Sequence, residues 1–566
     1  MATAVTTAKN PKIRRMRKDV IGVRDFCIIW IILWALGGTP RAVAQTPAKG
    51  AVSVKDFGAK GDGITDDRAA IQAAIDSVTA GAVYFPPARG GYLITPAPDR
   101  KQFLALKSNV QLIGDGNPVI RVAGASAPYD SVISSSFCDH CLIQDLTIDS
   151  NIGSNPIQDK SEIYAHGRTE IAFAGGRWIR VEHVTIENSS SMNSIVSGVQ
   201  VSNIRITHCA FTGNGDDPNH VVHDHSALYI HADGAVIDGN VFQAVRRGAP
   251  AAVTAIETHG SGISVTANVI ADYAVGMNLT GVAPSDSVGN VVTGNTIRGG
   301  LFGIQIWSDR YRGHSNGYGV NGLSITGNTI VINQSSYTSP LGTAMATSGI
   351  TVESNSNLPI ANVIISGNAV IFDLEGSPRP ASSSSIGIGW WSTIGQTAEN
   401  LIIANNIVDN APVAGIRLAA ALKGCMVKGN IIRNAGSSLD KAIAAGYETP
   451  IFIAGAPSID VEIVDNQMID TLEPSRMRTA LLLATSKGMS SGLRVRNNSV
   501  SVLASDRASF HSHVQILDDN TRPLLVADWD DFAAPSRRVS SGSAVTDSKN
   551  GTSWRAGSDG IMRKQR

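Results

Sequence analysis

The stretch Val236-Ile-Asp-Gly-Asn-Val-Phe242 returns in almost the same form as Val291-Val-Thr-Gly-Asn-Thr-Ile297, Ser324-Ile-Thr-Gly-Asn-Thr-Ile330 and Ile364-Ile-Ser-Gly-Asn-Ala-Val370. Five looser copies end at Ile270, Val408, Ile432, Met468 and Val500. All nine of these copies have an Asn, with one apolar residue three positions before it and another two positions after it. Three earlier copies keep the apolar frame but carry Leu146, Val184 or Cys209 in place of the Asn. The copies recur every ~24 to ~40 residues, a spacing typical of solenoid coils.

The pattern within each copy predicts two short strands joined by a tight bend. Apolar residues alternate on both sides of the Gly-Asn step, as they do in strands, and the alternation breaks at that step. Gly and Asn both tolerate a left-handed backbone, which suits a bend. One copy is too short to bury a face alone, but stacked copies share a core, and Asn side chains at one corner can bond from coil to coil. We therefore predict an all-β fold, a right-handed parallel β-helix of about a dozen coils. A propeller or sandwich would show regular hairpin turns instead.

The bulk composition excludes a strong electrostatic partner. Lys and Arg number 47 and Asp and Glu number 47, so no net field draws the chain to nucleic acid or an anionic membrane. Four basic residues between positions 14 and 18 precede the apolar run Phe26–Leu36 and the small residues Ala42-Val-Ala44. This order is typical of a signal peptide cleaved near Ala44, and it predicts a secreted or periplasmic protein with no stable membrane span after cleavage. An uncleaved anchor is the alternative, although the run is short for a bilayer.

Cysteine is sparse, and its positions favour packing over chemistry. Cys141, Cys209 and Cys425 fall in the frame of the repeat, where they are expected to fill the core. Cys138-Asp-His-Cys141 has the spacing of a redox or zinc pair, but no second pair accompanies it, so we predict no metal site.

The segment after the signal peptide predicts a strand over Val52–Phe57, a glycine turn over 58–63 and a helix. Thr65 or Asp66 is expected to cap that helix, whose apolar face would cover the open end of the first coil. Two strands follow, at 81–86 and 91–94. The pair Asp66-Asp67 is explained by a helix N-terminus more simply than by catalysis.

Residues 52–75, Val-Ser-Val-Lys-Asp-Phe-Gly-Ala-Lys-Gly-Asp-Gly-Ile-Thr-Asp-Asp-Arg-Ala-Ala-Ile-Gln-Ala-Ala-Ile, closely resemble the opening of the rhamnogalacturonase/epimerase-like pectate lyase superfamily. The resemblance covers about residues 50–125, and the Asn repeat extends it to about residue 500. It implies a secreted β-helix protein that acts on polysaccharide. Lyases, hydrolases, epimerases and phage tailspikes share this fold, so the resemblance does not decide the reaction.

Two departures from the superfamily matter for the reaction. The paired Asp and Gly-His-Gly constellation of polygalacturonases survives only as fragments, at Gly215–Asp217 and Thr258–Gly260. The Tyr-Gly-Phe-Asp-Pro-His type of motif found in alginate epimerases is absent from the sequence.

A second recurring strand, Gly-Ile-x-apolar-x, lies between the Asn units. Its copies start at Gly276, Gly303, Gly349, Gly387 and Gly415, and two looser copies contain Tyr229 and Glu257. Alternation sends the x residues outward, where they would line a long shallow groove. The residues expected to bind a polysaccharide there are Asn278, Gln305, Trp307, Glu353, Trp391 and Arg417. Sugar rings offer apolar faces and hydroxyl groups, which such a lining matches.

Titratable groups crowd at one end of this stripe, and we predict that the catalytic residues are Tyr229, His231, Glu257, His259 and Asp309. For β-elimination of a uronate, Asn278 would hold the carboxylate, His259 would take the C5 proton and Tyr229 would protonate the leaving oxygen. For hydrolysis, Glu257 would pair with Asp309 at ~10 Å or with the nearer Asp233. Elimination is favoured. A second group, His220, His223, Asp224 and His225, is expected to be a solvated loop cluster rather than a metal site.

The prediction is a secreted polysaccharide-degrading enzyme, with a lyase acting on an acidic glycan favoured. A glycoside hydrolase and a non-catalytic glycan-binding protein are the alternatives. The sequence requires no cofactor and leaves Ca²⁺ open. It also leaves the oligomeric state open, with a trimer among the alternatives. We expect a signal peptide over 1–44, an N-terminal cap and first coils over 45–125, the β-helix over 126–505, closing strands over 506–536 and a disordered tail over 537–566.

Overall fold

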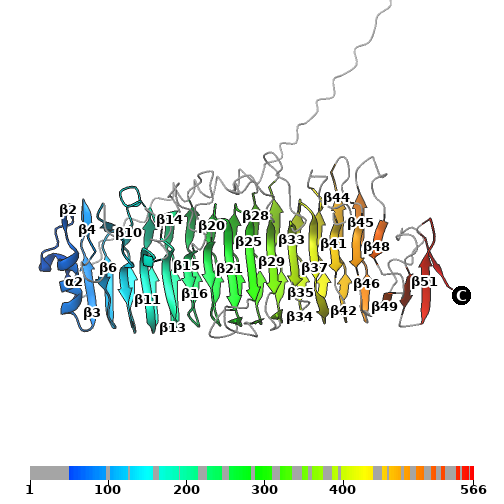
Figure 1. The fold of residues 1–566 in the computed structure, drawn as a ribbon, viewed down its shortest axis with the longest axis horizontal. Helices are drawn as coiled ribbons and strands as arrows, with labels where there is room; N and C mark the ends of the chain where they lie inside the picture. The colour runs from blue at the N-terminus through cyan, green and yellow to red at the C-terminus, as the bar shows by residue number, and fades with distance from the viewer. Residues whose placement is uncertain are drawn as a thin grey trace, which may run out of the picture. The chain divides into compact units, whose positions relative to one another are not determined.

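The protein is described by a computed structural model in which two units are distinguished, Met1–Thr46 and Pro47–Arg566. The structure describes, within the second unit, residues 50–96, 102–124, 128–156, 165–189, 191–214, 226–244, 254–281, 287–308, 319–333, 347–354, 360–373, 385–392, 397–437, 449–454, 458–472, 477, 479–484, 492–502, 512–517, 524–528, 544–547, 551–559 and 561–565. The signal peptide predicted over 1–44 lies outside these residues. Strands make up nearly all the secondary structure, and they stack side by side as coils of a parallel β-helix (Figure 1).

Most coils contribute one strand to each of three columns, and the strands of a column pair in parallel with the coils before and after. The front column consists of β5 (Gln102–Ala105), β8 (Ser131–Ser135), the first parts of β11 (Thr169–Glu182) and β13 (Asn193–Thr207), β15 (Ser226–Ile230), β18 (Thr254–Thr258), β21 (Val275–Gly281), β25 (Phe302–Ser308), β29 (Ser348–Ser354), β33 (Ile386–Ser392), β37 (Ala414–Ala419), β41 (Thr449–Ala454), β45 (Thr479–Ala484) and β48 (Ser512–Leu517).

The second column follows the front strand in each coil. It consists of β1 (Val52–Ser53), β3 (Gly81–Phe85), β6 (Val110–Gly114), β9 (Leu142–Gln144), the last parts of β11 and β13, β16 (Val236–Asp238), β19 (Ser264–Thr266), β23 (Val291–Thr293), β27 (Ser324–Thr326), β31 (Ile364–Ser366), β35 (Ile402–Ala404), β39 (Met426–Lys428), β43 (Glu462–Val464), β46 (Leu493–Arg496) and β49 (Leu524–Asp528). In six coils a short strand precedes it, as β22 (Ser287–Val288) precedes β23.

The third column closes each coil. It consists of β2 (Asp62–Asp66), β4 (Gly91–Ile94), β7 (Val119–Val122), β10 (Thr147–Asp149), β12 (Thr185–Glu187), β14 (Ala210–Asn214), β17 (Val241–Ala244), β20 (Val269–Ala271), β24 (Thr296–Arg298), β28 (Thr329–Ile332), β32 (Ala369–Phe372), β36 (Ile407–Asp409), β40 (Ile431–Arg433), β44 (Gln467–Asp470) and β47 (Ser499–Val502). The predicted strand, bend and strand of the repeat are therefore the second column, a corner and the third column.

A ladder of buried Asn side chains runs through that corner, as predicted. It consists of Asn240, Asn268, Asn295, Asn328, Asn368, Asn406, Asn430, Asn466 and Asn498. Each Nδ2 donates to the Oδ1 of the next Asn at 2.9–3.0 Å. The same Oδ1 accepts the backbone N–H of the preceding Asn, and each Nδ2 also donates to a carbonyl one coil back. The amides are paired in a core without water, where an unpaired polar group would be costly.

The left-handed residue at the corner is the one before the ladder Asn, which corrects our expectation that Gly and Asn share that role. Gly239, Gly294 and Gly367 have φ between 65° and 67°, and the looser copies place Ala267 or Asn405 there at 53° and 56°. The ladder Asn itself is not left-handed. Its side chain, rather than its backbone tolerance, selects Asn at this position.

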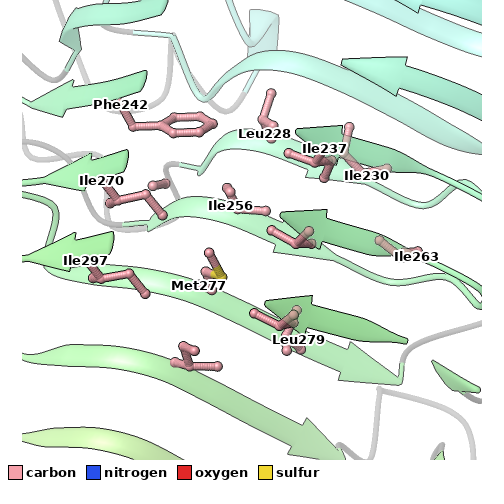
Figure 2. Packing of buried hydrophobic residues seen from close by; sticks show 14 of the residues in the cluster. Leu228, Ile230, Ile237, Phe242, Ile256, Ile263, Ile270, Met277, Leu279 and Ile297 are labelled. Carbon is pink, nitrogen blue, oxygen red and sulfur yellow. The ribbon is translucent and has the colours of Figure 1, made fainter. Parts of the chain in front are cut away.

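The core is a continuous column of apolar side chains between the three sheets (Figure 2). The apolar pairs that flank each Asn are buried, apart from the partly buried Val500. Ile237, Phe242, Ile270 and Ile297 are among the residues that point into this column (Figure 2). Successive coils thus bury the faces that no single coil could bury alone.

The N-terminal segment differs from our prediction in two respects. The strand ends at Ser53, and Val54–Phe57 forms the 3₁₀ helix η1. Helix α2 (Arg68–Ser77) begins after Asp67, whose side chain does not cap it, while Asp66 Oδ1 accepts the N–H of Arg68 at 3.1 Å. The Asp67 carboxylate instead accepts the N–H groups of Lys60 and Gly61, which fixes the preceding turn. Helix α2 buries Ile71, Ala74 and Ile75, while its role as a cap stays a prediction.

We predicted a disordered tail over 537–566. The structure corrects this prediction, because the described part of the tail contains strands. The closing strands expected near 514–517 and 524–527 are β48 and β49. Strand β50 (Ala544–Asp547) pairs in parallel with β49, and β51 (Thr552–Ala556) and β52 (Met562–Lys564) then pair antiparallel. The composition of the tail suggested disorder because it did not reveal these backbone pairings.

Cys138 and Cys141 form a disulfide, and both are buried. Cys141 fills the core as expected, and the Cys138–Cys141 spacing marks a disulfide rather than two free thiols. Cys209 and Cys425 are free and buried, as predicted.

A buried carboxyl group lies among the early coils. Glu170 is fully buried and accepts hydrogen bonds from the hydroxyls of Ser150, Ser189 at 2.7 Å and Ser191 at 3.1 Å. Burial raises its pKa to about 7, against the opposing effect of these hydrogen bonds.

Replacing Asn368 by Ala should lower the free energy of unfolding by about 2–4 kcal/mol, because it removes two donor bonds of Asn368 and leaves the backbone N–H of Asn328 without its acceptor in the core. Calorimetric melting would show the loss. Asn362→Gly is the control, because Asn362 is left-handed and its amide bond to Asn321 is exposed. Equal losses in both variants would contradict the importance of burial.

Glu170 should make stability depend on pH. Its folded pKa lies above the ordinary 4.5, so its contribution is complete at low pH and is lost as pH rises through about 7. From about pH 5 to about pH 8 the wild type should lose up to roughly 3 kcal/mol relative to Glu170→Gln. Denaturant titrations of both proteins across this range test it, and parallel pH profiles would refute it.

Candidate functional site

The outward side chains of β15, β18, β21, β25, β29, β33 and β37 form what we call the front face. Two columns predicted from the sequence are in register on it. One runs Tyr229, Glu257, Asn278, Gln305, Thr351, Gly389 and Arg417, and the other runs Thr280, Trp307, Glu353 and Trp391. The parallel pairing thus places side chains from distant parts of the sequence beside one another.

Four of the five predicted catalytic residues come together at the start of the front face. His259 Nε2 lies 2.9 Å from Glu257 Oε1, and the hydroxyl of Ser226 donates to Glu257 Oε2. The side chain of Glu257 is 14% exposed and that of His259 is 4% exposed. This carboxylate–imidazole pair is consequently a largely buried unit with a fixed orientation.

Tyr229 and His231 pack against that pair. The His231 and His259 rings stack with centroids 4.3 Å apart, and the Tyr229 ring lies 4.8 Å from His231 and 4.7 Å from His259. Tyr229 and His231 are only partly buried. They are therefore the members of the cluster that a ligand on the front face can reach.

The environment keeps His231 neutral and Glu257 ionised. Burial lowers the pKa of His231 to about 4, the neighbouring His259 lowers it further, and Glu257 opposes both. Burial alone would raise the pKa of Glu257, but the hydrogen bond and charge of His259, with the bond from Ser226, hold it below its ordinary value. Two buried imidazole nitrogens, Nδ1 of His231 and Nδ1 of His259, have no hydrogen-bond partner among the described residues.

The predicted binding residues follow this cluster along the front face, but the face is less open than expected. Asn278, Trp307 and Glu353 are partly buried, whereas Gln305, Thr280 and Thr351 are buried. Asn278 Oδ1 and Trp307 Nε1 have no hydrogen-bond partner within the described chain. Arg417 lies over the ring of Phe452 on the next strand, with 5.4 Å from Cζ to the ring centroid.

Some predicted residues cannot be placed. Asp309 and the cluster His220, His223, Asp224 and His225 lie outside the described residues. Trp391 lies in β33, in register with Glu353, but its side chain is outside the described part.

Sequence reasoning missed Ser226 and Ser197. Ser226 opens the strand that carries Tyr229, and its hydroxyl reaches the carboxylate of the next coil. The Ser197 hydroxyl accepts the backbone N–H of His231 at 3.1 Å. Strand alternation assigns a residue to a face but does not show that a short hydroxyl reaches across coils.

Among the described residues, no three His, Cys, Asp or Glu side chains are grouped in a way that could hold a metal ion. In the same residues, no helix has the length and apolar character needed to cross a membrane.

Comparison with known proteins extends these observations. The sequence model of the family described as Rhamnogalacturonase A/epimerase, pectate lyase-like, matches residues 51–278, which include the whole cluster. Residues 51–278 therefore match the pectate lyase-like family. This confirms the resemblance that residues 52–75 suggested.

Curated relatives match this protein over limited segments. Mannuronan C5-epimerase AlgE6 of Azotobacter vinelandii is 36% identical over 148 residues, which cover 24% of this chain and 16% of the relative. Alginate lyase 7 of the same organism is 33% identical over 204 residues, covering 34% and 21%. The matched segments thus span about a fifth or less of these relatives.

A solved structure shows the same fold along most of this chain. A point mutant of the tailspike protein of E. coli bacteriophage HK620, in complex with pentasaccharide, aligns with a TM-score of 0.58 and 16% identity. The alignment covers 82% of this chain and 80% of the tailspike. At this identity the likeness is one of fold.

The pKa of His231 should respond in opposite directions to its two neighbours. Glu257→Gln removes a negative charge and should lower the pKa below about 4, whereas His259→Gln removes the imidazole that lowers it and should raise it. NMR titration of labelled histidines would measure both shifts. A wild-type His231 that titrates near 6.5 would contradict this environment.

Proposed function

We propose that this protein is secreted, binds an acidic polysaccharide along the front face and cleaves it by β-elimination at the Tyr229–His259 cluster. The observation that carries the proposal is the cluster itself, a phenol and two stacked imidazoles backed by an ionised carboxylate. The named activities of the relatives, on alginate and mannuronan, make a polyuronate the first substrate to test.

The reaction begins with removal of the C5 proton of a uronate. His231 is the imidazole within reach of a sugar and is neutral, so it can accept that proton. This revises our expectation for His259, which is buried and bonded to Glu257. Glu257 and His259 act as a positioning pair behind His231, in the way that a carboxylate orients an imidazole in hydrolytic triads.

The electrons of the C5–H bond then form a double bond between C4 and C5, and the C4–O4 bond breaks. Tyr229 donates its proton to the departing O4, which gives one unsaturated uronate end and one new hydroxyl end. Asn278, one coil beyond Glu257, is placed to hold the substrate carboxylate through its amide. Gln305, Trp307, Glu353, Trp391 and Arg417 are proposed to bind sugar units further along.

C5-epimerisation is the second candidate, because an epimerase is among the relatives. It shares the first step but returns a proton to the opposite face of C5, so the C4–O4 bond survives. Hydrolysis has less support, because it needs a protonated carboxyl acid and Glu257 is held ionised.

Secretion is supported by the predicted signal peptide and by the disulfide between Cys138 and Cys141. Disulfides persist in oxidising compartments and are rare in the cytosol.

His231→Gln should lower turnover of the preferred polyuronate by about 10²-fold or more, as expected for loss of a general base. Alginate and polygalacturonate are incubated with the full chain, and unsaturated uronate is followed by absorbance. The matched control is His183→Gln, at an exposed corner away from the front face, which should leave turnover unchanged.

Each product separates one reaction from the others. Reducing ends without unsaturated uronate would overturn elimination in favour of hydrolysis. A changed C5 configuration without cleavage, seen by NMR, would establish epimerisation. Binding with no product would leave a glycan-binding protein.

A further inference from the structure

A second column of left-handed residues runs along the solenoid, at the bend just before each strand of the second column. Its members are in register and have φ between 51° and 70°. They are Asn109, His140, Trp178, Asn203, Gly234, Gly262, Gly289, Gly322, Asn362, Asn400, Gly424, Asp460 and Gly492.

Trp178 is the exception in this column, because every other member is Gly, Asn, Asp or His. A left-handed backbone is unfavourable for a bulky side chain, and such outliers cluster at functional sites. Packing does not compensate for the conformation, since the Trp178 side chain is 53% exposed. An exposed indole on an unfavourable left-handed backbone is therefore a candidate for ligand binding.

The neighbouring bends add exposed apolar side chains. Phe137 is 57% exposed on the coil before Trp178, and Val199 is 53% exposed on the coil after it. The Phe137 ring lies against Gly175, where a Cβ atom would come within 3.3 Å of it. Large exposed apolar side chains gathered on adjacent coils are typical of an interaction surface.

The front strands beside these bends have small side chains. Ala172 of β11 and Val196 of β13 precede Tyr229 in its column, and Ala174 and Gly198 lie two positions further along the same strands, so no large side chain blocks an approaching chain at these positions. Phe137 lies in the bend that follows β8, three strands before β15 in the front column, or ~14 Å at the usual strand spacing.

The charges on these coils suit an anionic ligand. Arg177 precedes Trp178, lies 3.6 Å from Asp139 and keeps 62% of its side chain exposed. Arg180 lies 3.6 Å from Glu182 and pairs in register with the exposed Arg205, so guanidinium groups remain accessible beside these carboxylates. Guanidinium groups bind carboxylates with two parallel hydrogen bonds, and aromatic faces stack on the apolar faces of sugar rings.

We propose that Trp178 and Phe137 form a sugar-stacking site that holds the stretch of acidic polysaccharide lying N-terminal to the Tyr229–His259 cluster. The proposal rests on the proposed function and extends it, since it fixes the direction in which the glycan leaves the cluster. The site favours long chains, because Trp178 lies on β11, two strands or ~10 Å before β15, so a bound glycan must extend beyond the cluster to reach it.

The test compares Trp178→Asn with Asp460→Asn, which places the same residue at the same left-handed position far along the column. Alginate and polygalacturonate serve as probes, in affinity electrophoresis of the full chain and in turnover assays with polymer and with trisaccharide. Trp178→Asn should weaken polymer binding at least five-fold and raise KM for the polymer, with kcat and trisaccharide turnover unchanged. Its Tm should equal or exceed that of the wild type, because Asn relieves the backbone.

Further variants keep the result interpretable. Trp178→Phe retains a stacking ring and should keep most of the affinity, Phe137→Ala should lose part of it, and Asp460→Asn should bind like the wild type. Wild-type binding and KM in Trp178→Asn would overturn this proposal while leaving the cluster active. A wild-type protein that neither binds nor converts any acidic polysaccharide would overturn the proposed function and this site together.

Discussion

The pairing of buried Asn amides is the constraint on which the rest of the structure depends. A side-chain amide enclosed in an apolar core must find partners for its donors and acceptor, and here each finds them in the coils on either side. The amides can meet that requirement only if every coil of the ladder brings its Asn to the same corner. It consequently sets the register of the second and third columns, and through them the register of the front face.

The ladder fixes the register of the strands but not the length of the segments that join them. Successive ladder residues are separated by as few as 24 positions and by as many as 40. Segments between strands can therefore differ in length from coil to coil while the strands stay aligned. The varied spacing of the repeat follows from this arrangement, which keeps Tyr229 beside Glu257 whatever length of chain joins them.

The fold was largely predictable, because the ladder leaves a polar residue inside an apolar frame and that pattern is visible in one sequence. The predictions that were wrong depended on details of the backbone conformation. Gly and Asn share a tolerance for left-handed conformations, so the sequence did not show that Gly239 takes it and Asn240 does not. The residues after Ser53 have strand-like alternation but form a 3₁₀ helix, whose N-terminus the Ser53 side chain caps.

The residues that form the site could be predicted from the sequence, but the burial of each residue could not. Alternation named Tyr229, His231, Glu257 and His259, and the structure brings them together. Strand alternation could not show that His259 is buried beneath His231, because burial depends on how rings stack across coils. Trp178 escaped notice because its distinction is a backbone angle, which becomes visible only when the column is aligned.

The change in strand direction after β50 has a consequence for self-association. A solenoid of parallel strands presents an unpaired edge where its coils stop, on which the first coil of a second molecule could continue the stack. Here β51 and β52 pair antiparallel beyond the last parallel strand of this sheet. The antiparallel strands thus cover the edge of this column on which another parallel coil could otherwise stack.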